Sequence, residues 1–189
     1  MLSACSSKQG IRYDAASAQS VVACRSFDGS ALPCRRCARQ ALLQTRAQDP
    51  ARGCTEPAAV ALATAAAASL LKEKDIDRIE LWVDPNIYKN GTAVAIPGTR
   101  GMTGLDVAAG VGAFGGNPHL GLEVLNTVDQ ISIDRTNALI AAQGVEIHLF
   151  DKSGLHVRAR ISSGSDRAVA EIKDLHNNII HLSLNNKEI

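Results

Sequence analysis

A single cysteine, Cys54, stands directly before Thr55, Glu56 and Pro57 at the start of an alanine-rich stretch. Pro57 suits the first turn of a helix, so the sequence predicts a helix from Glu56 to about Lys74, with Thr55 or Glu56 as its cap. A thiol in such an entry turn feels the positive end of the helix dipole, which lowers its pKa and favours the thiolate. Glu56 opposes that shift. Cys54 is therefore a candidate base, and a small buried apolar side chain is the alternative.

Further along the chain, polar residues suit the binding of a small charged ligand. Lys89 and Asn90 are predicted to lie on a turn between two strands, where they would hold a carboxylate, although a plain solvated turn fits nearly as well. In the next glycine-rich segment, Gly98 and Thr99 would offer N–H and hydroxyl groups to an anion, although a plain connecting loop fits equally well. His176 is expected at the start of the last strand, where a lone histidine is more often structural.

Gly110, Gly112 and Gly115 satisfy the G-x-G-x-x-G pattern of dinucleotide sites. That pattern carries its mechanism only when a strand runs into it and a helix leaves it. Here a glycine-rich loop comes first, and the three glycines lie within a predicted helix over residues 105–116. Close helix packing is therefore favoured over nucleotide binding.

The cysteines number five, and an odd count argues against a closed disulfide framework. Cys34 and Cys37 form one C-x-x-C pair, but a zinc site needs four ligands. Two incidental thiols are the preferred interpretation, and a small metal-binding or interaction module is the alternative. The histidines show no spacing typical of a metal site, so we predict none.

The composition fits one domain of an ordinary globular protein, because 189 residues are enough for a core. A net charge of +1 gives no reason to expect nucleic acid as a partner. No window approaches the roughly 20 apolar residues of a membrane helix, so we expect a cytoplasmic chain without a membrane partner. Aromatic residues make up only 3%, so the core must consist of small aliphatic side chains and closely approaching backbones.

Regular patterning begins after residue 50, and residues 1–50 are expected to be a poorly patterned extension, for which disorder is one interpretation. Residues 51–189 are predicted to fold as α+β, with Ala/Gly-rich helices packed on an antiparallel β-meander towards the C-terminus. A hairpin turn is expected over residues 151–154. Besides the segments already named, helices are expected over 119–128 and 132–143, and strands over 77–83, 92–96, 145–150, 155–161, 168–173 and 178–184.

Several motifs occur together in one order: GCTEP at 53–57, DPNIYKNG at 84–91, IPGT at 96–99, GLDVAAGVGAFGGNPHLGLEVL ending at 125, and HNNIIHL at 176–182. In this combination the chain resembles the amino-terminal half of the L-cysteine desulfidase family, which is similar in turn to the alpha part of iron–sulfur L-serine dehydratases. The resemblance covers roughly residues 52–185. Where that family has PGTGMVG this chain has PGTRGMTG, so Arg100 looks inserted.

The resemblance implies β-elimination of L-cysteine to sulfide, ammonia and pyruvate, and it leaves open whether a similar small amino acid such as L-serine is the substrate instead. It implies a 4Fe-4S iron–sulfur cluster acting as a Lewis acid, with cluster ligands that are not in this chain. It assigns the catalytic base to Cys54. The substrate-binding residues it suggests are Thr55, Glu56, Lys89, Asn90, Gly98, Thr99, His176 and Asn178.

The chain is accordingly expected to be a fragment that is inactive alone and needs a missing C-terminal segment as its partner. Whether it acts as an enzyme stays open at this stage, and so does assembly into a homo-oligomer. The alternatives are a non-catalytic remnant and the small module built on Cys34 and Cys37.

Overall fold

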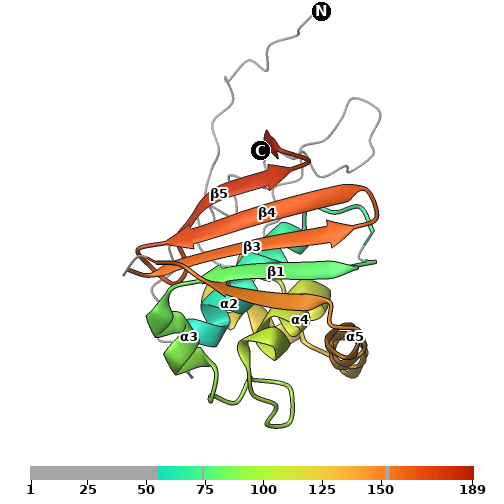
Figure 1. Cartoon of the computed structure of the whole chain (residues 1–189). Helices are drawn as coiled ribbons and strands as arrows, with labels where there is room; N and C mark the ends of the chain where they lie inside the picture. Colours follow the sequence, from blue (N-terminus) through green and yellow to red (C-terminus); the bar gives the residue numbers. More distant parts are fainter. Residues whose placement is uncertain (1–54, 74, 152–153) are drawn as a thin grey trace, which may run out of the picture. The chain divides into compact units, whose positions relative to one another are not determined.

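A buried, alanine-rich helix lies against one face of a six-stranded sheet (Figure 1). The computed structural model describes residues 55–73, 75–151 and 154–189, which fall in a single unit of the chain. The predicted α+β fold is confirmed. In order, its elements are α2 (Thr55–Ala68), β1 (Arg78–Val83), α3 (Pro85–Gly91), α4 (Leu105–Gly115), the 3₁₀ segment η1 (Pro118–Thr127), α5 (Gln130–Ala141), β2 (Val145–Leu149), β3 (His156–Ser163), β4 (Asp166–Lys173), β5 (Ile179–Leu184) and β6 (Lys187–Glu188).

The strands follow the order β2-β1-β3-β4-β5-β6, and every pair is antiparallel except β1 with β2. Strands β3 to β6 therefore form the predicted meander. In β1 the side chains alternate, as expected for a sheet with one covered face. Ile79, Leu81 and Val83 are fully buried on the helix side, whereas Glu80 and Trp82 belong to the other face.

The predicted hairpin between β2 and β3 is wrong, because β1 lies between them. Glu80 of β1 is in register with Glu146 of β2 on one side and with Arg160 of β3 on the other. The long helical connection from β1 to β2 delivers β2 parallel to β1, as such crossovers do. Strand β3 then pairs with the other edge of β1. The local turn signal at residues 151–154 does not reveal this arrangement.

Helix α2 is buried all round, because its alanines let both the sheet and the other helices come close. Its residues from Pro57 to Ala68 are all buried. The helix ends at Ala68 rather than at Lys74. Leu70 N and Leu71 N bond to the carbonyls of Ala67 and Ala68 at 3.1 and 3.2 Å, which tightens the chain into the 3₁₀ pattern that closes many helices.

Helices α2 and α4 touch at a glycine. A Cβ atom added to Gly112 would lie 2.5 Å from the carbonyl oxygen of Ala61 and 2.5 Å from Oγ1 of Thr64. No side chain larger than hydrogen fits there without moving a backbone. Glycine at position 112 is therefore required for α2 and α4 to approach this closely.

The other two glycines of the G-x-G-x-x-G pattern face α5. A Cβ atom added to Gly110 would lie 2.4 Å from Cγ2 of Thr136, and one added to Gly115 would lie 2.4 Å from Oγ of Ser132. All three glycines lie inside α4, with no strand running into them. The pattern therefore serves close helix packing, as the sequence analysis favoured.

The turn predicted at Lys89–Gly91, and the strand predicted after it, are wrong. Residues 85–91 form helix α3, and beyond it only Ala95 makes an isolated bridge, to Thr103. Asp84 causes the difference, because its Oδ1 accepts hydrogen bonds from the backbone N–H groups at positions 86 and 87 and Pro85 occupies the first helical position.

Gly112→Ala is expected to lower the free energy of unfolding by about 2–3 kcal/mol, because the added methyl meets backbone that cannot move aside. Gly110→Ala should also destabilise, but Thr136→Ala should restore part of that loss, since the atoms in the way belong to the Thr136 side chain. Urea unfolding of the single and double variants measures both effects.

Thr136→Ala in the Gly112→Ala background is the matched control and should give no rescue. A Gly112→Ala variant as stable as the wild type, or stabilised by alanine's better helix propensity of about 1 kcal/mol, would contradict the close helix crossing.

Candidate functional site

Segments far apart in the sequence meet at the amino-terminal end of α2. Oγ1 of Thr55 lies 3.3 Å from Nε2 of His176, which belongs to the turn between β4 and β5. The Thr55 hydroxyl donates to Oε2 of Glu56 at 3.4 Å. Nδ2 of Asn90, near the end of α3, donates to Oε1 of Glu56 at 3.1 Å. The structure thus brings together four of the predicted ligand-binding residues, and both oxygens of the Glu56 carboxylate accept a hydrogen bond.

Helices α2 and α4 run parallel and start at this same end. A Cβ atom added to Gly91 would lie 2.4 Å from Cδ2 of Leu105, the first residue of α4, and 3.7 Å from Cβ of Glu56, in the first turn of α2. Further along, Gly112 of α4 lies against Ala61 of α2. The positive ends of two helix dipoles therefore lie side by side, which favours an anionic group such as a carboxylate.

His176 is a half-buried imidazole with a perturbed pKa. Burial lowers its pKa below the ordinary value, against the opposing influence of the carboxylates of Glu56 and Asp84. The ring is consequently neutral at pH 7, with one nitrogen that accepts a hydrogen bond and one that donates.

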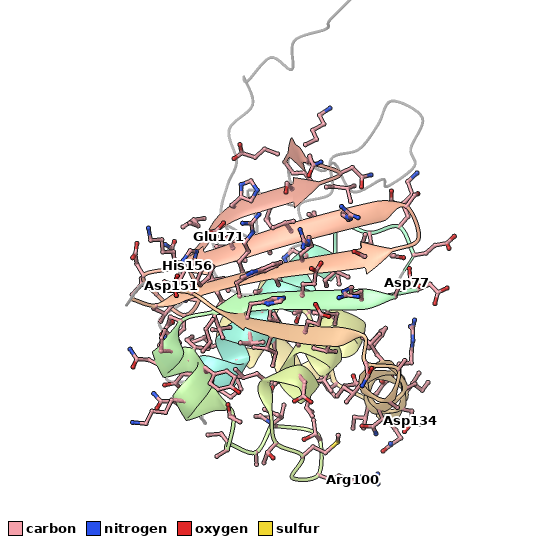
Figure 2. All side chains as sticks on the ribbon, viewed as in Figure 1. Asp77, Arg100, Asp134, Asp151, His156 and Glu171 are labelled. Atoms are coloured by element: carbon pink, nitrogen blue, oxygen red, sulfur yellow. The ribbon has the colours of Figure 1, made fainter. Side chains whose placement is uncertain are left out.

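The remaining predicted residues lie on α3 and in the loop that precedes α4. Lys89 is exposed on the last turn of α3. Thr99 is buried and its hydroxyl donates to the carbonyl of Ile96 at 2.7 Å, which closes its own loop. Gly98 has a positive φ of 80° in that loop, and Arg100 lies at the loop's outer tip (Figure 2).

Asn178 holds the turn that carries His176. Its Nδ2 donates to the carbonyl of Lys173 at 3.0 Å. His176 precedes β5, which begins at Ile179, so the prediction that it starts the last strand is wrong by a few residues. Cys54, Cys34 and Cys37 lie outside the residues that the structure describes.

Sequence reasoning missed Asp84, which is only 1% exposed. Besides capping α3, its Oδ2 accepts a hydrogen bond from the backbone N–H of His156 at 3.1 Å, which ties α3 to β3. Nε2 of His156 in turn lies 2.5 Å from Oε1 of Glu171 (Figure 2). The His156 ring also stacks on Phe150. The Asp-Pro pair was a readable helix-start signal, interpreted only as the end of a strand.

A second polar cluster lies on the face of the sheet opposite α2. Glu80, Glu146 and His148 bring ligand atoms within 4.8 Å of one another. However, Arg160 binds both oxygens of Glu80 at 2.6 Å, which holds the pKa of that carboxyl below its usual range, and Arg78 contacts Glu146. Guanidinium groups already neutralise both carboxylates, so this cluster does not favour a metal ion.

An iron–sulfur cluster needs thiolate ligands. All five cysteines lie at or before position 54, so the described residues include none. These residues do not fit such a cluster, and we derive no step from it.

Fold and site together define an α+β unit that gathers a carboxylate, a hydroxyl, an amide and a neutral imidazole beside two parallel helix ends. The chain is similar to UPF0597 proteins. One from Desulforapulum autotrophicum is 49% identical over 142 residues, or 74% of this chain and 32% of the relative. One from Desulfotalea psychrophila is 48% identical over 139 residues, and YhaM from Escherichia coli O1:K1 is 44% identical over 139 residues.

The chain spans about a third of the length of these relatives. No family model matches it, and no solved structure does. The predicted membership of the L-cysteine desulfidase family is wrong, because the relatives at 44–50% identity carry the UPF0597 name. That name specifies no reaction. Among the described residues, no helix is long and apolar enough to span a membrane.

The lowered pKa of His176 predicts that the protein loses stability as the pH falls below about 6.5, the ordinary histidine value. In the window between the folded pKa and that value the unfolded chain binds the proton and the folded chain does not, so acid favours unfolding. In urea unfolding, His176→Gln should lose less of its free energy of unfolding than the wild type between pH 7.5 and pH 5.5.

His119→Gln, which removes an exposed imidazole, is the matched control and should behave as the wild type. Equal pH dependence in wild type and His176→Gln would contradict the burial of His176.

Proposed function

We propose that this site binds a small amino acid with a leaving group on its β-carbon, L-cysteine or L-serine, for β-elimination by a longer protein of the UPF0597 type. The observation that carries the proposal is the convergence of Glu56, Thr55, Asn90 and His176 at the paired starts of α2 and α4. An amino-acid zwitterion matches this site, because the Glu56 carboxylate lies beside the positive ends of the two helix dipoles.

Each end of the zwitterion has a counterpart. The substrate ammonium would lie at the carboxylate of Glu56, whose orientation Thr55 and Asn90 fix. Charge-assisted hydrogen bonds of this kind are about twice as strong as neutral ones. The substrate carboxylate would lie at the positive ends of α2 and α4, and the ammonium of Lys89 would add to the attraction.

Cys54 remains the proposed base, since it directly precedes Thr55 in the sequence. Its thiolate would take the α-proton, the Cα–Cβ double bond would form as the Cβ–S bond breaks, and sulfide would leave with the electron pair. The aminoacrylate would tautomerise to an imine, and water would release ammonia and pyruvate. A helix start suits a thiolate base at neutral pH.

The 4Fe-4S cluster stays part of the proposal only for the longer protein, because its thiolate ligands would come from outside the described residues. The C-terminal segment that would carry them is the proposed partner. The alternative function, a metal-binding or interaction module on Cys34 and Cys37, depends on residues outside those that the structure describes.

Calorimetric titration of L-serine into the chain tests the proposal. We expect saturable binding, weakened at least tenfold by Glu56→Gln, because removing the charge from a hydrogen-bonded ion pair costs about 1.5–3 kcal/mol. Glu123→Gln is the matched control: Oε2 of Glu123 also accepts from an asparagine, Nδ2 of Asn126 at 3.2 Å, but on an exposed surface. It should bind as the wild type.

Sulfide release then tests the reaction itself. We expect none from L-cysteine with this chain alone, and release by the full-length Desulfotalea psychrophila relative. Absence of binding to the chain together with absence of sulfide from the relative would contradict the proposed function.

A further inference from the structure

The hydroxyl of Thr55 has two neighbours and only one proton. Oε2 of Glu56 lies at 3.4 Å and Nε2 of His176 at 3.3 Å. A hydroxyl donates one hydrogen bond and accepts others through its lone pairs. An ionised carboxylate can only accept. If the Thr55 proton points to Glu56, then Nε2 of His176 must itself carry a hydrogen and donate it to Thr55.

Charge decides between the two neighbours, because the two distances are nearly equal. A hydrogen bond to an ionised carboxylate is about twice as strong as one between neutral groups. The carboxylate of Glu56 therefore takes the threonine proton in preference to the neutral imidazole. The order of donation is then His176 to Thr55 and Thr55 to Glu56.

We propose that Thr55 is a positioning residue that fixes His176 as the Nε2–H tautomer and leaves Nδ1 as the acceptor for the ammonium of an amino-acid ligand. Among the described residues, Nδ1 of His176 makes no hydrogen bond. An ammonium has three N–H groups, enough for Glu56 and His176 together. The use of Nδ1 toward a ligand rests on the proposed function, whereas the tautomer does not.

The surroundings of His176 keep the ring neutral, as this role requires. Among the described residues, the charged groups that act on it are Glu56 of α2 and Asp84 at the start of α3, and both favour protonation. Burial outweighs them and lowers the pKa. A protonated ring would donate from both nitrogens and could accept nothing from an ammonium.

Nitrogen-15 NMR of the histidine-labelled full chain at pH 7.5 reads the tautomer directly, with His176→Gln to assign the signals. We expect Nδ1 of His176 to give the signal of an unprotonated ring nitrogen and Nε2 that of an N–H. Thr55→Ser, which keeps the hydroxyl, should preserve this pattern. Thr55→Val, which keeps the shape, should give a mixture of tautomers. A proton on Nδ1 in the wild type, or an unchanged pattern in Thr55→Val, would overturn the inference.

Adding L-serine to the same sample separates this inference from the proposed function. We expect the Nδ1 signal to shift on binding, and Thr55→Val to bind roughly two- to tenfold more weakly, the loss expected for one hydrogen bond. If the tautomer is found but L-serine leaves the Nδ1 signal unmoved, the role of Nδ1 toward a ligand fails. Failure of the proposed function itself shows in the calorimetric and sulfide measurements, whatever the tautomer.

Discussion

The contact between Gly112 and Ala61 is the constraint on which the rest of the structure depends. It lets α4 lie directly on the backbone of α2, with 2.5 Å from the position of an added Cβ to the Ala61 carbonyl oxygen. Because the two helices run parallel, the same contact places their starting turns side by side. Alanine along α2 extends the close approach to the sheet, and Gly91 extends it to α3.

Asp84 connects this helical layer to the sheet at the end where the candidate site lies. A single buried carboxylate caps α3 with one oxygen and holds β3 with the other. Helix α3 therefore ends where Asn90 reaches Glu56, and the turn after β4 brings His176 to Thr55. The face of the sheet opposite α2 differs in kind, since arginines across the strands neutralise its Glu80 and Glu146.

The fold class was predictable from the sequence, because the spacing of apolar residues in long periodic segments indicates both the type of element and its buried face. Alternation in β1 predicts a strand with one buried face, and continuous alanine in α2 predicts a buried helix. The pairing of β2 with β1 was not predictable, since strand order depends on contacts far apart in the sequence. Of the site, Thr55 and Glu56 could be located at a helix start, but their meeting with His176 depends on the tertiary fold. Whether Thr99 binds a ligand is not something its loop motif can decide, because the same hydroxyl closes the loop.

The most direct test of the central claim is a nuclear Overhauser measurement between the Hα protons of Gly112 and the Hα proton of Ala61. The position of an added Gly112 Cβ lies 2.6 Å from Cα of Ala61, so the hydrogens of the two Cα atoms must be close. The account predicts a strong cross-peak there, together with one between Gly91, at the end of α3, and Glu56, in the first turn of α2. Absence of the Gly112–Ala61 peak in a folded, assigned spectrum would contradict the parallel helix contact and, with it, the placement of the site.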